Sequence, residues 1–230
     1  IRYDVPNFQT KVNLLTNLIQ DEEVFHRIII FAKTKQSVNR IFGNLSKLGK
    51  DNIRLIHSNK GQNTRINAFK DFREGKIRIL VATDVMARGI DIKEVSHVFN
   101  FDVPTVYEDY VHRIGRTGRA FCIGAAITFV TKSDQYHIGK IEKKIRMPIP
   151  KVDLPEAVEI TETPFQENQE IEREIDKQKH KENPDYKGAF HEKKSYKVKI
   201  KNKQSKRPKK HTGKSNSGYI SKVKKNKKSS

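Results

Sequence analysis

Arginines recur at every third position in the segment from His112 to Arg119, and glycines separate them. Two glycines inside one helix would cost about 1 kcal/mol each relative to alanine, so we expect a helix that ends near Arg113 and continues as a short loop. Such a loop can aim Arg116 and Arg119 at one small anionic target, because planar guanidinium groups pair well with phosphate oxygens. A solvent-exposed basic surface is the alternative, but it requires neither the glycines nor the histidine.

A second candidate segment, Thr83 to Asp91, leaves an apolar run and reaches a glycine within six residues. Thr83 can donate its hydroxyl, and the turn after it can offer backbone N–H groups to a phosphate. Gly89 allows close backbone approach to a ligand, and Asp91 can accept hydrogen bonds from sugar hydroxyls. The alternative is an ordinary turn in which Asp84 caps a short helix and Asp91 pairs with Arg88. The residues alone leave both interpretations open.

Gln62 and Arg65 lie one turn apart at the start of a predicted helix. A helix N-terminus that carries an amide and a guanidinium suits a nucleic-acid backbone phosphate. A helix start with ordinary polar surface residues is the alternative, and in isolation the pattern favours it.

The elements that must position these residues alternate along the chain. Apolar runs predict strands at residues 27–32, 53–57, 77–83, 97–101 and 125–130, and helical spacing predicts helices at about 10–20, 38–48, 62–74, 106–113 and 133–145. This alternation predicts an α/β fold, a parallel sheet with helices on both faces. Ligands of such sheets bind at the carboxyl ends of the strands. The polar residues after the strands, 33–35, 57–60, 83–84 and 102, should therefore share one edge, and residues 112–119 should fold toward it.

Charge divides the 230 residues into three parts. Residues 1–150 carry 25 basic and 15 acidic side chains, residues 151–180 carry 4 and 9, and residues 181–230 carry 18 and 3. We expect an interdomain linker at 1–8, a domain at 9–147 and an acidic linker at 148–180 with one helix near Glu167–Lys179. Residues 181–230 have few large apolar side chains, so we expect a disordered lysine-rich tail.

The net charge of +20 indicates a polyanionic partner, nucleic acid first and an anionic membrane surface second. No apolar stretch approaches the roughly 18 residues that a membrane span needs, and no signal-peptide pattern opens the sequence. The single cysteine, Cys122, excludes an intrachain disulfide and disfavours a metal site. We expect a reducing, cytoplasmic location.

Four segments together resemble a known family. Phe31–Lys35, Gln62-x-x-Arg65, Ala82–Asp91 and His112–Arg119 are similar, in this order, to motif IV, the QxxR motif, motif V and motif VI of the second RecA-like domain of DEAD-box RNA helicases. The resemblance covers about residues 1–147. Motif VI is specific, because DEAH-type helicases begin it with Gln rather than His, and residues 104–120 most resemble the bacterial RhlE-like branch. The stretch from His57 to Gly61 departs from the pattern, since the family usually has His-Gly-Asp there.

The resemblance implies roles for individual residues. Arg116 and Arg119 would be arginine fingers that reach the γ-phosphate of ATP, His112 would couple to the carboxylate motif across the cleft, and Arg113 would support it. The nucleotide ribose would contact Gly89 and Asp91. The RNA backbone would be held by Lys33, Thr34, Lys35, Gln62, Arg65, Thr83, Asp84 and Arg88.

These motifs make up half of such an enzyme. No Asp-Glu-Ala-Asp run or P-loop occurs, and Thr212-Gly213-Lys214-Ser215 lies in the lysine-rich tail without a strand before it. ATP and Mg²⁺ would therefore be held mainly by an N-terminal RecA-like domain of the same protein, and this segment alone should be inactive. Single-stranded or locally unwound RNA is the expected substrate, with ribosomal or RNP particles as a further class of partner.

Two questions stay open at this point. Aromatic residues among the tail lysines can stack on unpaired bases, although a merely solubilising tail explains them equally well. A non-catalytic RNA-binding platform is the main alternative to a helicase, and a DNA helicase of the same superfamily is a weaker one.

Overall fold

The structure, a computed structural model, describes residues 1–47, 49, 52–87, 95–117 and 125–186. Residues 1–184 form one compact unit and residues 185–230 are a second. The predicted tail at 181–230 therefore falls almost entirely outside the described residues.

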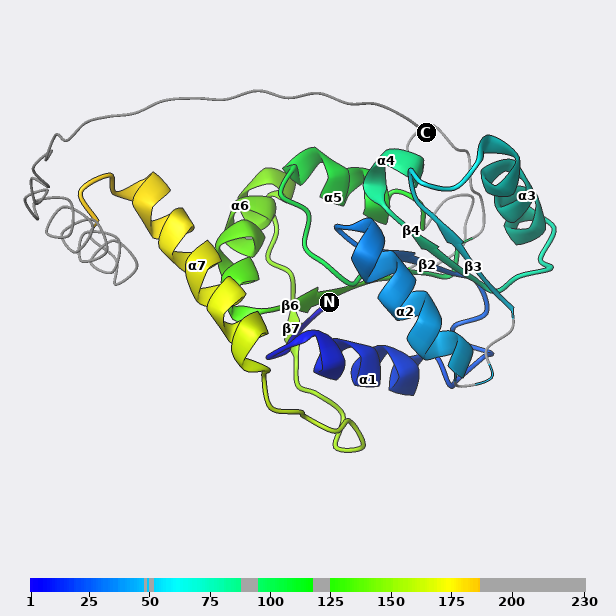
Figure 1. The fold of residues 1–230 in the computed structure, drawn as a ribbon, viewed down its shortest axis with the longest axis horizontal. Coiled ribbons are helices and arrows are strands. Elements are labelled where there is room, and N and C mark those ends of the chain that lie inside the picture. Colours follow the sequence, from blue (N-terminus) through cyan, green and yellow to red (C-terminus); the bar gives the residue numbers. More distant parts are fainter. Residues whose placement is uncertain (48, 50–51, 88–94, 118–124, 187–230) are drawn as a thin grey trace, which may run out of the picture. The chain divides into compact units, whose positions relative to one another are not determined.

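A parallel sheet is the centre of the first unit (Figure 1). Within the described residues it has seven strands, and their bounds confirm the five that the apolar runs predict. Every neighbouring pair is parallel, as the alternation of strands and helices predicts. In spatial order the strands are β3 (Ile53–Ile56), β4 (Ile79–Ala82), β2 (Ile28–Phe31), β5 (His97–Asn100), β6 (Ala125–Val130), β1 (Arg2–Asp4) and β7 (Lys151–Val152).

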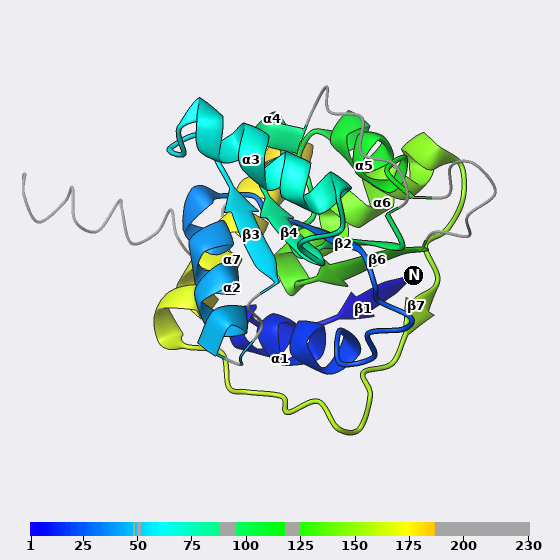
Figure 2. The same cartoon turned by 90° about the vertical axis from the view of Figure 1, so that its right-hand side faces the viewer.

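Helices cover both faces of the sheet because its central strands are apolar on both sides. The helices are α1 (Phe8–Leu18), α2 (Lys35–Lys47), α3 (Gln62–Arg73), α4 (Asp84–Ala87), α5 (Tyr107–Ile114), α6 (Gln135–Ile145) and α7 (Phe165–Glu182), with a 3-10 turn, η1, at Lys132–Asp134. Successive strand residues point to opposite faces, and all four residues of β2 are buried. Ile28 and Ile30 pack with α1 and α2, whereas Ile29 and Phe31 pack with α3. Figure 2 shows α1 and α2 on one side of the sheet and α3, α5 and α6 on the other.

Two details of the helices differ from the sequence prediction. The helix predicted from about residue 10, with threonine as a candidate cap, begins earlier, because Asn7 caps α1 and its side chain accepts a hydrogen bond from the Thr10 N–H at 2.8 Å. Apolar spacing predicts Ile66 on the buried face of α3, but this residue is 54% exposed, because Ala68, Phe69 and Phe72 form that face.

The ends of the first unit also differ from the predicted boundaries at 8 and 147. Residues 2–4 form β1 between β6 and β7, and residues 151–152 form β7. Three and two residues are too few to show an alternating pattern, so the sequence carries no strand signal there. The predicted helix at 167–179 is confirmed and extends over all of α7.

The segment from residue 153 to α7 is fastened to the start of α1. The Asn7 amide donates to the Thr161 carbonyl at 2.7 Å, and the Phe8 N–H donates to a Glu167 carboxylate oxygen at 2.6 Å. At the far end of α7, Gln178 donates to the Ser133 carbonyl at 3.0 Å. Residues 148–182 are thus part of the folded unit. None of the helices in the described part of the chain has the length and apolar character of a membrane span.

Candidate functional site

The carboxyl ends of the central strands bring several predicted site residues to one edge. The Thr83 N–H donates to the Ile56 carbonyl at 3.3 Å, which joins the ends of β4 and β3. The Lys33 N–H donates to an Asp102 carboxylate oxygen at 3.0 Å, which joins the ends of β2 and β5. The polar residues after four strands therefore lie along a common edge, as the parallel topology predicts.

Arg113 is a buried and fully engaged charged group at this edge. It is 2% exposed, and its guanidinium binds both Asp84 carboxylate oxygens, at 2.5 and 2.8 Å. Its Nη1 group donates to the Asn100 side chain at 3.1 Å and to the Asp102 carbonyl at 2.7 Å. Phe31 lies under the guanidinium, 5.1 Å from it. Arg113 thus fastens the end of α5 to the ends of β4 and β5.

A buried polar cluster beneath α5 holds Asn100 in place. Its amide donates to the Thr128 hydroxyl at 3.1 Å, and the Tyr110 hydroxyl lies 3.3 Å from the same oxygen. Asn100 and Thr128 are completely buried. Satisfied buried networks of this kind fix one geometry, because any rearrangement leaves a polar atom unpaired. The positions of the groups that accept hydrogen bonds from Arg113 are therefore fixed before any ligand binds.

Asp102 joins this cluster to α1. Its carboxylate accepts from the Lys11 ammonium at 3.0 Å, and a second carboxylate, Asp134, lies 3.9 Å from that ammonium. Burial opposes the charge on Asp102, but Lys11, the Lys33 amide and Arg113 together lower its pKa below the ordinary value. Burial likewise opposes the charge on Lys11, yet the two carboxylates raise the Lys11 pKa. Both groups are therefore charged at neutral pH.

His57 orders the loop between β3 and α3. Its Nδ1 accepts from the Asn59 N–H at 3.3 Å, so Nε2 carries the proton and donates to the Asn39 side chain at 3.2 Å. Burial, with smaller contributions from Lys60 and Lys35, lowers the pKa of His57. A neutral histidine therefore ties this loop to α2, although the loop sequence departs from the family pattern.

The predicted RNA-binding residues that the structure describes present different surfaces. Lys33, Thr34 and Lys35 are exposed at the start of α2, where the Thr34 hydroxyl accepts the Ser37 N–H at 3.0 Å. Gln62 is exposed and Arg65 is half-buried on the first turn of α3. The Asp84 carboxylate is already bound by Arg113, which differs from the prediction that it faces RNA.

The arginine segment itself follows α5, which ends at Ile114 close to the predicted position. The side chain of His112 is 60% exposed and lies 3.8 Å from Asp109. Arg116 is half-buried, and Thr117 forms a parallel bridge with Val95, which precedes β5. Thr117 therefore lies at the amino end of β5, and the prediction that the whole arginine segment folds toward the carboxyl edge is wrong for this residue. A Cβ at Gly115 would lie 3.2 Å from the Val111 carbonyl oxygen, so glycine suits this turn.

Four predicted site residues, Arg88, Gly89, Asp91 and Arg119, lie outside the described residues. Sequence reasoning missed Lys11, Asn100 and Thr128. Lys11 stands between Phe8 and Val12 on the apolar face of α1, and Asn100 interrupts an apolar strand, so a polar residue at a core position was the available signal.

The described residues fit only part of a nucleotide site. Arg116 is a guanidinium at a partly exposed turn, which suits a phosphate group. No group of three or more His, Cys, Asp or Glu side chains that could hold a metal ion occurs among the residues that the structure describes. Arg116 therefore fits the phosphate part of such a site.

The sheet order, the helices on both faces and the basic residues at one edge define a RecA-like domain. The model of the helicase conserved C-terminal domain matches residues 10–121. The crystal structure of the E. coli DEAD-box protein SrmB bound to regulator of ribonuclease activity A is 38% identical, with a TM-score of 0.64 over 71% of this chain and 95% of that chain. The chain therefore belongs to the DEAD-box RNA helicase family and carries its C-terminal RecA-like domain.

Other relatives agree with this assignment. The chain is 46% identical over 147 residues to the ATP-dependent RNA helicase RhlB of Psychromonas ingrahamii, which covers 63% of this chain and 34% of that protein. The structure of S. cerevisiae Dbp5 bound to RNA and ADP BeF3 is 32% identical, with a TM-score of 0.59 over 77% of this chain and 44% of that chain. The chain thus spans about a third of the length of the curated relatives that it matches.

Proposed function

We propose that the chain is the second RecA-like half of an ATP-dependent RNA helicase. It supplies arginine fingers for ATP hydrolysis and part of the grip on the RNA backbone, for local duplex unwinding or RNP remodelling. The observation that most directly supports this proposal is the Arg113–Asp84 fork. It joins the helix before the arginine fingers to the turn after β4, so the two predicted ligand-binding segments move as one body.

The nucleotide side of the proposal rests on Arg116 and Arg119. When bound, ATP and Mg²⁺ supply the phosphoryl group and neutralise part of its charge, and both would be held mainly by the N-terminal RecA-like domain. Arg116 then approaches the γ-phosphate as the two domains close, and a supplied arginine finger contributes about 10³–10⁵ in rate. The exposed His112 would contact the opposite domain, and Gly89 and Asp91 would contact the ribose.

The RNA side rests on the residues at the sheet edge and on the start of α3. Lys33, Lys35, Gln62 and Arg65 would bind successive phosphates of a single strand. When both domains close on one RNA strand, that strand must follow a bent path that a continuous duplex cannot follow, so the other strand separates locally. Thr83 and Arg88 would contribute to the same grip.

A single substitution in the full-length protein tests the proposal. Arg116→Ala should lower the ATPase kcat by at least about 10³ while RNA affinity changes little, because a finger acts on charge in the transition state. Steady-state ATPase rates and equilibrium binding of single-stranded RNA measure the two effects. Arg173→Ala, an exposed arginine on α7, is the control and should leave both unchanged.

Other outcomes would change the assignment. Equal loss of ATP turnover and RNA binding would reject the finger role of Arg116. RNA binding without any nucleotide dependence would favour a non-catalytic platform. The relation to the RhlE-like branch stays a prediction, since the relatives named above include a RhlB protein. A cytoplasmic location and contact with ribosomal or RNP particles belong to the same proposal.

A further inference from the structure

The face of α7 that lies against the domain is acidic. Glu167, Glu170, Ile171 and Glu174 follow one another at spacings of three, one and three, which places them on one face of a helix. They line a cavity of about 300 Å³ together with Lys33 at the end of β2. A helix that packs on a domain usually presents apolar residues at such positions, but three of these four are glutamates. This face therefore needs an explanation other than packing.

The opposite wall of the cavity does not neutralise the glutamates. It contributes two further carboxylates, Asp102 and Asp134, and two ammonium groups, Lys11 and Lys33. Lys11 is bound to Asp102 at 3.0 Å, so it is already engaged within that wall. Five carboxylates and two ammonium groups line the cavity, and Lys177, on the same helix, pairs with Glu174 at 3.3 Å. Two negative charges are therefore left unbalanced, and the Glu174 carboxylate is only partly neutralised. The Glu170 side chain makes no hydrogen bond or ion pair within the part of the chain that the structure describes, whereas its backbone takes part in the helix.

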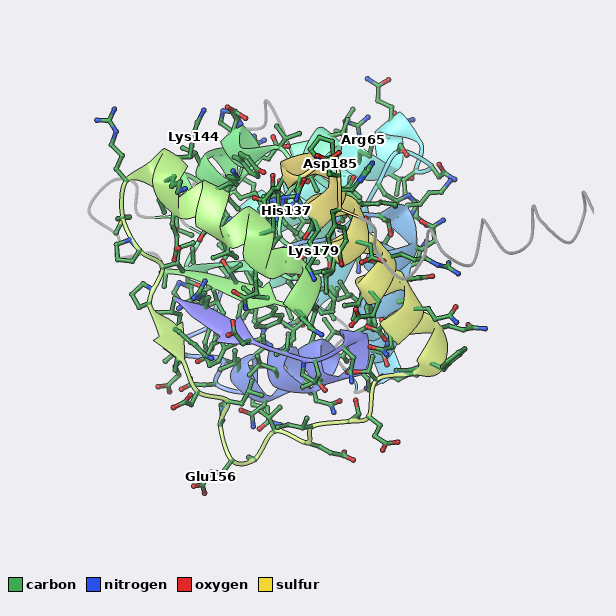
Figure 3. The ribbon with its side chains drawn as sticks, turned by 90° about the vertical axis from the view of Figure 1, so that its left-hand side faces the viewer. Arg65, His137, Lys144, Glu156, Lys179 and Asp185 are labelled. Carbon is green, nitrogen blue, oxygen red and sulfur yellow. The ribbon has the colours of Figure 1, made fainter. Side chains whose placement is uncertain are left out.

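The helix cannot easily turn this face away from the edge. Its first turn is held by the Glu167 carboxylate on the N-terminus of α1, and its last turn by Gln178, which donates to the Ser133 carbonyl at 3.0 Å. Gln178 also lies 3.4 Å from His137 of α6, and Figure 3 shows His137 on α6 next to α7. The acidic face is therefore fixed at the end of β2 whenever α7 is docked.

We propose that α7 is a built-in electrostatic competitor that weakens the grip of the Lys33 end of the sheet edge on an RNA backbone. This inference rests on the proposed function, in which Lys33 binds phosphate. A phosphate that approaches Lys33 meets the repulsion of Glu170 and Glu174 across the cavity. The effect limits how tightly RNA is held at this end and favours its release.

Neutralising the two glutamates tests the idea. In the full chain, E170Q/E174Q should tighten binding of a labelled single-stranded oligouridylate by about two- to fivefold at 50 mM salt, because in water one like charge about 10 Å from a phosphate changes affinity by about a factor of two. The gain should disappear near 0.5 M salt, where the Debye length falls to about 4 Å. The charge reversal E170K/E174K should give a larger gain. Fluorescence anisotropy measures the affinity, and thermal melts followed by circular dichroism show that each variant is folded.

Two controls separate a local effect from net charge. E156Q/E159Q removes the same charge from the loop before α7, where Figure 3 shows Glu156 at the tip, and it should leave RNA affinity unchanged. The gain from E170Q/E174Q should vanish when Lys33→Ala is added. An equal gain in E156Q/E159Q, a gain that survives Lys33→Ala, or no gain at all would overturn the proposal. Failure of the helicase assignment would show separately, as an Arg116→Ala enzyme with normal ATP turnover.

Discussion

At the scale of single residues, Arg113 and Arg116 belong to the same arginine segment but have different structural environments. Arg113 is buried and makes four hydrogen bonds to three residues of other segments, whereas Arg116 is half-buried at the turn after α5. The first arginine holds the geometry of the site. The second is partly open to solvent, which is consistent with the ligand-binding role proposed for it above.

This difference predicts unequal effects of two substitutions on stability. Arg113→Ala should lower the free energy of unfolding by about 2–4 kcal/mol, since it leaves the Asp84 carboxylate and the Asn100 amide oxygen without their donor. Arg116→Ala should lower it by no more than about 1 kcal/mol. Urea unfolding of the full chain, followed by circular dichroism, measures both. Equal losses would mean that Arg113 is not the structural member of the pair.

The sequence indicated which residue types matter at this edge but not how they pair. Asp84 looked like a ligand-binding residue or a helix cap, and nothing in its neighbourhood pointed to an arginine 29 residues later. Such a pairing depends on how α5 lies against the sheet, which no local pattern encodes. Lys11 was also missed, but a local signal existed there, because a lysine at a core position of an apolar helix face indicates a buried partner.

At the scale of elements, the start of α1 contacts the segment that leads into α7, so parts of the first unit that are far apart in the sequence are joined there. Asn7 is completely buried, caps α1, and binds Thr161 through both oxygen and nitrogen of its side-chain amide. The Phe8 N–H binds Glu167. The cap of the first helix therefore also fastens the segment that leads into the last one.

We predict that Asn7→Ala lowers the free energy of unfolding by about 2–3 kcal/mol, because it removes a helix cap and leaves buried partners unpaired. Asn7→Asp keeps the cap acceptor but removes the donor to Thr161, so it should affect α1 less than the segment around Thr161. Hydrogen exchange measures the second effect, because the amides of residues 161–170 should exchange faster when the segment around Thr161 is released. Asn63→Ala, an exposed asparagine on α3, should change neither. Unchanged exchange in Asn7→Ala would contradict the fastening role.

Elements with a strong pattern were predictable, and elements without one were not. β2 and β4 are apolar throughout, so both their existence and their burial follow from the sequence. β1 and β7 are short and polar, and each is a strand only because a neighbour supplies the pairing. The helix within 165–182 was expected, but its docking depends on hydrogen bonds between residues more than 150 positions apart.

At the scale of the whole molecule, charge is distributed unevenly. Of the 47 lysines and arginines, 18 lie between residues 181 and 230, whereas α7 just before them begins with glutamates. Along the sequence, a basic segment thus follows an acidic one. We expect the basic segment to raise the rate at which the protein encounters RNA, because its positive charge attracts the phosphate backbone over a long range and for any RNA sequence.

Deleting residues 187–230 should test this contribution while leaving α7 intact. In the full-length protein, the RNA concentration for half-maximal ATPase activity should rise, and the slope of log affinity against log salt should become shallower by several units, about 0.7 for each phosphate that the tail neutralises. A tail of the same composition in scrambled order should restore the slope if the attraction is only electrostatic. An unchanged slope after deletion would remove the tail from RNA binding.

The pairing of β1 also has a consequence for biosynthesis. Arg2 of β1 pairs with Thr128 of β6, and the Ile1 nitrogen binds the Ala126 carbonyl, 125 residues further along the chain, so β1 cannot join the sheet until that stretch has been translated. At about 5–20 residues per second, ribosomes need roughly 6–25 s for this distance. Tyr3 and Val5, which end up buried, stay uncovered on the nascent polypeptide for that interval.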